Sequence, residues 1–243
     1  MWPRRYAAGE HQRVWAEMRA LGSACRDEPA LSACQQVARD TMRRVRANVV
    51  AVHRRLISLG YRFAFPAEAH VPPDDATTRR LAAFEDAVGP IPLSLHAFYE
   101  IVGGVNWMQH EDQLAAAFRP DRDEAPDLAL LGDEDPLVVV PMTDDGAVQR
   151  RWDHTWFLAP DEFAKSAYSG GEPYHLLLPD PAADFRVRGM PGIEEHFVDY
   201  LRAVFAGGGF HGRTQPCDDP PAWQKLPPQS AITRVLTHSL AAF

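Results

Sequence analysis

The stretch that decides the fold runs from residue 77 to residue 107 and reads TTRRLAAFEDAVGPIPLSLHAFYEIVGGVNW. Its apolar residues recur every three or four positions in two runs, and each run forms one stripe of an amphipathic helix. The first stripe consists of Leu81, Phe84 and Val88, and the second of Ile91, Leu95, Phe98 and Val102. Gly89 and Gly103 follow the two runs, where a helix end favours a residue that tolerates positive φ, and Pro92 suits the start of the second helix. The sequence therefore predicts two short helices joined by a Gly-Pro-Ile-Pro kink.

The residues before this stretch predict a helical hairpin. Apolar residues recur at helical spacing over residues 7–21 and 38–59, and the two runs end at Gly22 and Gly60. Steps of four and three alternate along the second run, as in a coiled-coil seam, which packs either within the chain or in a homodimer. Residues 63–73 are bounded by proline and predict an extended linker into the next part of the chain.

The charge of the chain is divided between its two parts. Residues 1–65 carry 12 arginines and 5 acidic residues, whereas residues 66–243 carry 13 basic and 28 acidic residues. We expect the arginines of residues 39–55 to lie off the apolar seam and to pair with the acidic part. Because no RNP, helix-turn-helix or zinc-finger signature accompanies them, we do not expect the chain to bind nucleic acid.

Residues 109–135 are irregular and acidic, so we expect them outside the core. Strand signals follow: β-branched or alternating residues predict strands at 137–140, 154–158, 174–178 and 184–188. Helical patterns accompany them at 161–170, where Asp161 caps the helix, and at 193–205, with Glu194 and Glu195 in the first turn. A last short helix is predicted at 232–240.

This order of elements is typical of an α+β fold with a mixed, largely antiparallel sheet flanked by helices and with an N-terminal helical hairpin. We divide the chain into an arginine-rich hairpin at 1–65, an α+β domain at 66–213, and a proline-rich tail with a short terminal helix at 214–243.

The sequence contains no complete catalytic pattern. It lacks the phosphate-loop, GxSxG and CxxC patterns, and its three cysteines are too scattered for a disulfide framework. The strongest metal-ligand cluster, His110-Glu111-Asp112, lacks metal-site spacing. We therefore predict no catalytic residue, cofactor or metal, and expect a reduced cytoplasmic protein without a membrane-crossing segment.

The run VGPIPLSLHAFYEIVGGVNW at residues 88–107 resembles the signature of the SUKH superfamily. That signature combines Gly, Ile or Leu, and Pro with a helix that carries Phe-Tyr and ends near a Gly and a polar residue. The likeness covers residues 75–210, mostly in the order of elements. It implies an α+β fold and, for bacterial members, an immunity protein that neutralises a toxin, often a nuclease. Eukaryotic members act as regulatory interaction modules.

We therefore predict a non-catalytic bacterial protein that occludes a basic toxin through an acidic surface. Complementary charge speeds such encounters. The predicted partner-binding residues are Glu111, Asp112, Asp121, Asp123, Glu124, Asp127, Asp133, Glu134, Asp135 and Trp107. Two alternatives remain open: a regulatory or scaffold protein, monomeric or homodimeric, and a hydrolase or metal enzyme whose site residues are dispersed along the chain.

Overall fold

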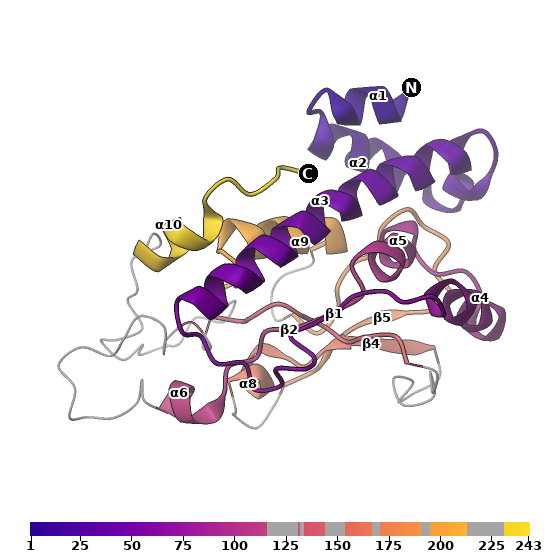
Figure 1. The fold of residues 1–243 in the computed structure, drawn as a ribbon. Helices are drawn as coiled ribbons and strands as arrows, with labels where there is room; N and C mark the ends of the chain where they lie inside the picture. The colour runs from indigo at the N-terminus through magenta and orange to yellow at the C-terminus, as the bar shows by residue number, and fades with distance from the viewer. Residues whose placement is uncertain (116–130, 132–133, 144–153, 167–170, 191–194, 213–230) are drawn as a thin grey trace.

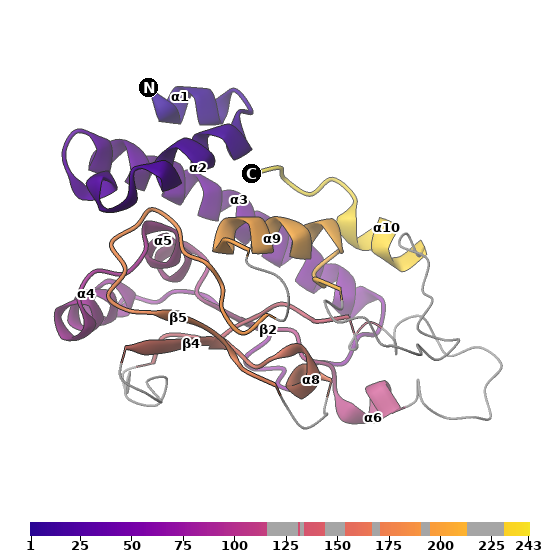
Figure 2. The ribbon, with the colours of Figure 1, turned by 180° about the vertical axis from the view of Figure 1, so that it is seen from behind.

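The computed structural model describes residues 1–115, 131, 134–143, 154–166, 171–190, 195–212 and 231–243. Most helices lie on one side of the antiparallel strands, and the short helices α6 (Glu111–Ala115) and α8 (Glu162–Lys165) lie beside the strands (Figure 1). Helices together with antiparallel sheets confirm the predicted α+β fold. The helices α3 (Ala30–Ser58), α5 (Leu93–Ile101) and α9 (Phe197–Ala206) lie on the same side of the strands in both views (Figure 2). One buried apolar cluster extends from Tyr6 to Phe243. None of the helices in these residues combines the length and the apolarity that a bilayer crossing requires.

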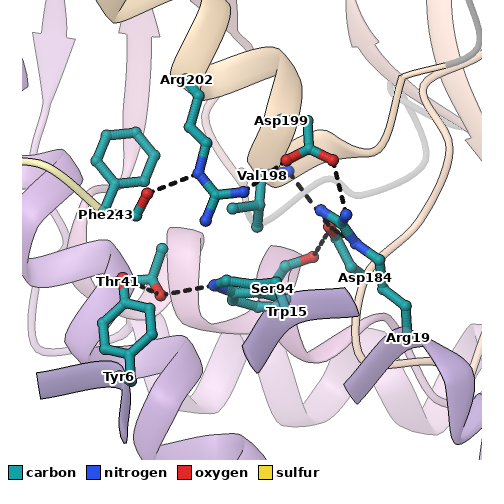
Figure 3. A network of polar contacts seen from close by, with 10 residues as sticks. All are labelled: Tyr6, Trp15, Arg19, Thr41, Ser94, Asp184, Val198, Asp199, Arg202 and Phe243. Atoms are coloured by element: carbon teal, nitrogen blue, oxygen red, sulfur yellow. Dashed lines mark hydrogen bonds and ion pairs between the residues drawn. The ribbon is translucent and has the colours of Figure 1, made fainter. Parts of the chain in front are cut away.

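The predicted N-terminal hairpin is present, and one further helix precedes it. The additional helix is α1 (Trp2–Ala7). The hairpin consists of α2 (His11–Ala20) and α3, which the 3-10 helix η1 (Gly22–Arg26) connects. Hydrogen bonds tie α1 and α2 to α3. The indole Nε1 of Trp15 donates to the hydroxyl of Thr41 (3.0 Å), which lies 2.8 Å from the hydroxyl of Tyr6 (Figure 3). Because all three side chains are buried, these bonds fix how the helices align.

The helices α4 (Thr77–Val88) and α5 form where the two apolar stripes predict them. Gly89 ends α4 with a φ of +85°, a conformation that favours glycine. Pro92 directly precedes α5, where its missing N–H leaves no helical hydrogen bond unmade. The ring of Phe98 in α5 packs edge-to-face on Phe197 of α9, with centroids 5.4 Å apart, so α5 joins the helical layer.

Two small antiparallel sheets form the other layer. The strands β1 (His70–Val71), β2 (Gly104–Asn106) and β3 (Val138–Val139) form one in that spatial order, and β4 (Thr155–Ala159) pairs with β5 (Tyr174–Leu177) in the other. The N–H of Val140 donates to the carbonyl of Leu158 (2.9 Å), which links the two sheets. The strands β3, β4 and β5 lie where the sequence predicts them. The strand β1 lies inside the predicted linker, and β2 was not predicted.

Gly103 should not tolerate a side chain. A Cβ atom there would lie 2.1 Å from the carbonyl oxygen of Val71, and the φ of Gly103 is +88°. We expect Gly103→Ala to lower the free energy of unfolding by about 2–4 kcal/mol, measured by urea denaturation, because β1 must move away from β2. Gly9 is a matched control, since its φ is +97° but nothing lies within 4 Å of its Cβ position. Gly9→Ala should cost only about 1–2 kcal/mol; equal losses would contradict a clash at Gly103.

The later helices agree with the sequence in part. Asp161 caps α8 (Glu162–Lys165) as predicted, because its Oδ1 accepts hydrogen bonds from two N–H groups of the first turn, at 2.9 and 3.1 Å. The last helix is α10 (Ala231–Thr237). The helix predicted at 193–205 begins only at Phe197, and Glu195 instead accepts a main-chain hydrogen bond from Val187 (2.8 Å). Residues 184–188 form isolated antiparallel bridges in place of a regular strand.

Candidate binding surface

Of the acidic residues predicted to bind a partner, only Glu111 and Asp112 are exposed among those that the structure describes. Glu111 and Asp112 are exposed at the start of a short helix, α6 (Glu111–Ala115), so this stretch is not wholly irregular. Arg62 Nη2 lies 3.7 Å from Asp112 Oδ2, and Glu134 is half-buried. The remaining predicted residues lie outside the described residues: Asp121, Asp123, Glu124, Asp127 and Asp133.

Trp107 and Asp135 are fully buried, which corrects the expectation that they lie on a binding surface. The ring of Trp107 packs edge-to-face on Phe205, with centroids 6.5 Å apart. The carboxylate of Asp135 accepts hydrogen bonds from Lys165 Nζ (2.6 Å) and from the hydroxyl of Tyr174 (3.1 Å). Burial raises the pKa of Tyr174 and the charge of Asp135 raises it further, so the phenol keeps its proton. The acidic residues around Asp135 predicted that it is exposed. That prediction is wrong because Lys165, which neutralises Asp135, belongs to α8 and is distant in the sequence.

The outward face of β4 and β5 carries apolar and aromatic side chains. Side chains alternate along the strands, and the core-facing set is Trp156, Leu158, Tyr174 and Leu176. By this alternation, Phe157, His175 and Leu177 share the opposite face of the two strands. The helices α3, α5 and α9 lie together on one side of the strands (Figures 1 and 2). Phe157 and His175 pair across the two strands, with ring centroids 6.5 Å apart, and Leu177 is 44% exposed. Leu177 is thus exposed on this surface and Phe157 is half-buried there, whereas His175 is only 8% exposed.

The extended segment 185–188 adds two arginines to the same face. His175 and Arg188 exchange both main-chain hydrogen bonds (3.0 and 2.9 Å), so their side chains share one face. Arg186 lies two residues earlier, opposite His196 in a second bridge, and both arginines are exposed. We define the β4–β5 outer face as Phe157, His175, Leu177, Arg186, Arg188 and His196.

A hollow of about 300 Å³ lies beside these arginines. It is lined by Glu172, His175, Arg186, Val187, Arg188, Gly189 and Met190. A Cβ atom on Gly189, whose φ is +86°, would lie 2.4 Å from the carbonyl oxygen of Pro173, so only glycine allows this close approach. His175 Nδ1 lies 2.9 Å from the same oxygen, which orients the imidazole ring.

The charge of the outer face comes from its arginines. Burial lowers the pKa of His196, and Arg19 and Arg186 lower it further, so this imidazole is neutral at pH 7. Among the described residues that line the hollow, Glu172 carries the opposing charge, and its Oε1 lies 3.6 Å from Nε2 of His175. Arg186 and Arg188 therefore bring two positive charges to this face, although residues 66–243 carry an excess of acids. The face complements a partner that presents carboxylates next to apolar groups.

The sequence contained part of the signal for this face. The run Phe-Arg-Val-Arg at 185–188 alternates apolar and charged residues, which places both arginines on one side of an extended segment. The strands predicted at 174–178 and 184–188 lie on either side of a Pro-Asp-Pro turn, but the sequence does not give the register that places Arg188 opposite His175.

His110 belongs to the strongest metal-ligand cluster of the sequence. Its Nδ1 lies 3.7 Å from Asp112 Oδ2. Over the part of the chain that the structure describes, no group of three or more His, Cys, Asp or Glu side chains lies together so that it could hold a metal ion.

Comparison of the chain with protein-family models, with curated proteins and with solved structures found no match in any of the three. The resemblance to the SUKH superfamily therefore rests on the residues quoted above.

Proposed function

We propose that this protein binds a protein partner through the β4–β5 outer face and catalyses no reaction of its own. The observation that carries this proposal is the combination of Arg186, Arg188 and Leu177 on one exposed face beside a hollow of about 300 Å³. Arginine and aromatic residues are enriched where interfaces concentrate their binding energy, and nearby apolar groups exclude water from such contacts. The hollow offers a place for an anchor side chain of the partner.

The resemblance to the SUKH superfamily supports a more specific form of the proposal. In that form the partner is a toxin, and this protein is a bacterial immunity protein that acts by occlusion. A basic, nuclease-type toxin would be attracted by the acids of residues 66–243, among which Glu111 and Asp112 are exposed. The two surfaces are distinguishable, because one depends on arginines and the other on carboxylates.

Co-expression with the product of the neighbouring gene tests both forms. We expect the two proteins to co-purify and, where the neighbour is a toxin, growth to be restored. Arg188→Glu should weaken the complex at least tenfold, or about 1.4 kcal/mol, measured by titration calorimetry. Arg54→Glu is the control and should leave the affinity unchanged, because Arg54 is an exposed residue of α3. The helix α3 lies on the other side of the molecule from β4 and β5 (Figure 1).

The outcomes separate the forms. If Glu111→Lys or Asp112→Lys weakens the complex and Arg188→Glu does not, the acidic surface is the binding face. Co-purification without any effect on growth supports the regulatory or scaffold alternative. Absence of both a complex and a growth effect contradicts the proposal.

A further inference from the structure

The short helix α1 depends on its docking against the rest of the molecule. Tyr6 is 1% exposed, and its hydroxyl lies 2.8 Å from the hydroxyl of Thr41 in α3 (Figure 3). The turn that leads into α2 is closed by main-chain hydrogen bonds to carbonyls of α1, donated by Ala8, Gly9 and Glu10 at 3.0, 3.0 and 3.1 Å. With six residues, α1 is too short to be a stable helix in water by itself, so it persists only while it is docked.

His11, the first residue of α2, lies against this docked helix. Its ring packs on the ring of Tyr6, with centroids 4.5 Å apart. Nε2 of His11 is buried and has no hydrogen-bond partner among the described residues. A neutral imidazole tolerates this arrangement, because one of its two nitrogens carries no hydrogen. An imidazolium carries N–H on both nitrogens, so it would bury a charged donor without an acceptor.

Two arginines add positive charge near His11. The guanidinium of Arg44 in α3 lies 5.6 Å from the centroid of the same Tyr6 ring, and its Nη1 donates to the main-chain oxygen of Ala242 instead of to a carboxylate (2.9 Å). Burial lowers the pKa of His11, and the charges of Arg44 and Arg202 lower it further, whereas a hydrogen bond to the main chain of Tyr6 opposes this. His11 also lies at the N-terminus of α2, where the helix dipole disfavours a positive charge.

Carboxylates around this contact are already paired with arginines. Arg5 of α1 binds Oε2 of Glu10 at 2.9 Å and Oε2 of Glu17 at 2.7 Å. Its hydrogen bonds lower the pKa of Glu10 and lower that of Glu17 to about 2, so both stay ionised between pH 5 and pH 7.5. Arg202 pairs with Asp199 at 2.5 Å. Among the described groups of this contact, His11 is therefore the one whose charge changes in this pH range.

We propose that His11 is an acid-sensitive switch that controls the docking of α1. While the imidazole is neutral, α1 stays on α3. Protonation adds a positive charge near Arg44 and Arg202 and buries an N–H that lacks an acceptor. The helix α1 then leaves α3 and melts, while the rest of the molecule stays folded. This switch does not involve the β4–β5 outer face and does not depend on the function proposed for it.

The direction of the pH dependence follows from the lowered pKa. A histidine whose pKa is lowered by folding contributes stability that is fully present above its unfolded value of 6.5 and is lost as the pH falls toward the folded pKa. Docking of α1 is therefore strongest at neutral and alkaline pH and weakens between pH 6.5 and pH 5.

Hydrogen exchange of the full chain, measured by mass spectrometry on peptides that cover residues 1–10, tests this. Protection factors, corrected for the intrinsic exchange rate at each pH, should fall at least about fivefold between pH 7.5 and pH 5.0. His11→Phe keeps a ring against Tyr6 but cannot take up a proton, so its protection should change less than about twofold. Peptides of α9 should keep their protection in both proteins. If circular dichroism shows that His11→Phe is unfolded, His11→Gln serves with the same expected result.

Matched arginine variants test the role of the nearby charge. Arg44→Met keeps an aliphatic stem near Tyr6 but removes the charge, so the fall in protection should shrink to less than about half of that in the wild type. Arg43→Met is the control and should leave the fall unchanged, because Arg43 is 62% exposed and pairs with Asp40. An equal fall in His11→Phe, no fall in the wild type, an undiminished fall in Arg44→Met, or a simultaneous loss of protection in α9 would overturn the proposal.

Discussion

Replacing Lys165 with methionine is expected to lower the free energy of unfolding by about 3–5 kcal/mol, because it leaves a buried carboxylate without its counter-ion. The side chains of Lys165 and Asp135 are both fully buried, and Nζ lies 2.6 Å from Oδ1. Tyr174 donates to the other carboxylate oxygen but supplies no charge. Urea denaturation at pH 7, followed by tryptophan fluorescence, measures the loss.

A second substitution separates charge from packing. Asp135→Asn added to Lys165→Met should recover at least half of the loss, because the amide is neutral and still accepts from Tyr174. Asparagine also tolerates the φ of +54° at this position. Arg13→Met is the control: Arg13 pairs with Glu17 at 3.4 Å but is 76% exposed, so the change should stay below about 0.5 kcal/mol. A double variant no more stable than Lys165→Met would contradict the role of the uncompensated charge.

Much of the fold could be predicted because its signals are local. The stripes that produce α4 and α5, and the β-branched run around β3, each lie within a few consecutive residues. The strands β1 and β2 have two and three residues, too few to show a period, and they exist because His70 pairs with Val105 and Val71 with Gly104. Such pairing depends on residues far apart in the chain, which a local pattern cannot show.

Predictions from local charge have the same limit, because they miss partners that are distant in the sequence. Acid density predicted that Asp135 faces solvent, but Asp135 is buried and pairs with Lys165, which lies 30 residues further along. The β4–β5 outer face depends on the pairing of His175 with Arg188, which neither segment reveals by itself. Composition therefore failed at Asp135, the residue that a distant cation neutralises, and most of the acidic stretch lies outside the described residues.

Arg19 joins the N-terminal helices to the rest of the molecule through a buried carboxylate (Figure 3). Its Nε and Nη2 donate to Asp184 Oδ2 at 3.0 and 2.8 Å, and the side chain of Asp184 is fully buried. Burial raises the pKa of Asp184 above its ordinary value of 3.8, and the charge of Arg19 is the main influence that opposes this rise. Arg19→Met is therefore expected to lower the free energy of unfolding by about 3–5 kcal/mol at pH 7.

This loss should grow as the pH rises. A carboxyl whose pKa is raised by folding contributes stability that is fully present below its unfolded value of 3.8 and is lost as the pH rises through the folded pKa. Without Arg19 the pKa of Asp184 rises further, so the variant should lose most at neutral pH and least near pH 4. Asp199 acts in the same direction. Although burial opposes the shift, Arg19 lowers the pKa of Asp199, and this stabilisation is fully present above the unfolded value of 3.8 and is lost as the pH falls through the lowered folded pKa.

Asp184→Asn in the Arg19→Met background distinguishes the buried charge from lost packing. The amide keeps an acceptor for the hydroxyl of Ser94, which donates to Asp184 Oδ1 at 2.8 Å, but it carries no charge. The double variant should therefore recover part of the stability at pH 7, and most of its pH dependence between pH 4 and 7 should disappear. Denaturation curves at pH 4, 5.5 and 7 measure both effects. If Arg19→Met costs the same at all three pH values, Arg19 acts through the packing of its aliphatic stem, and the N-terminal helices are held to the α+β part by apolar contact instead of by charge.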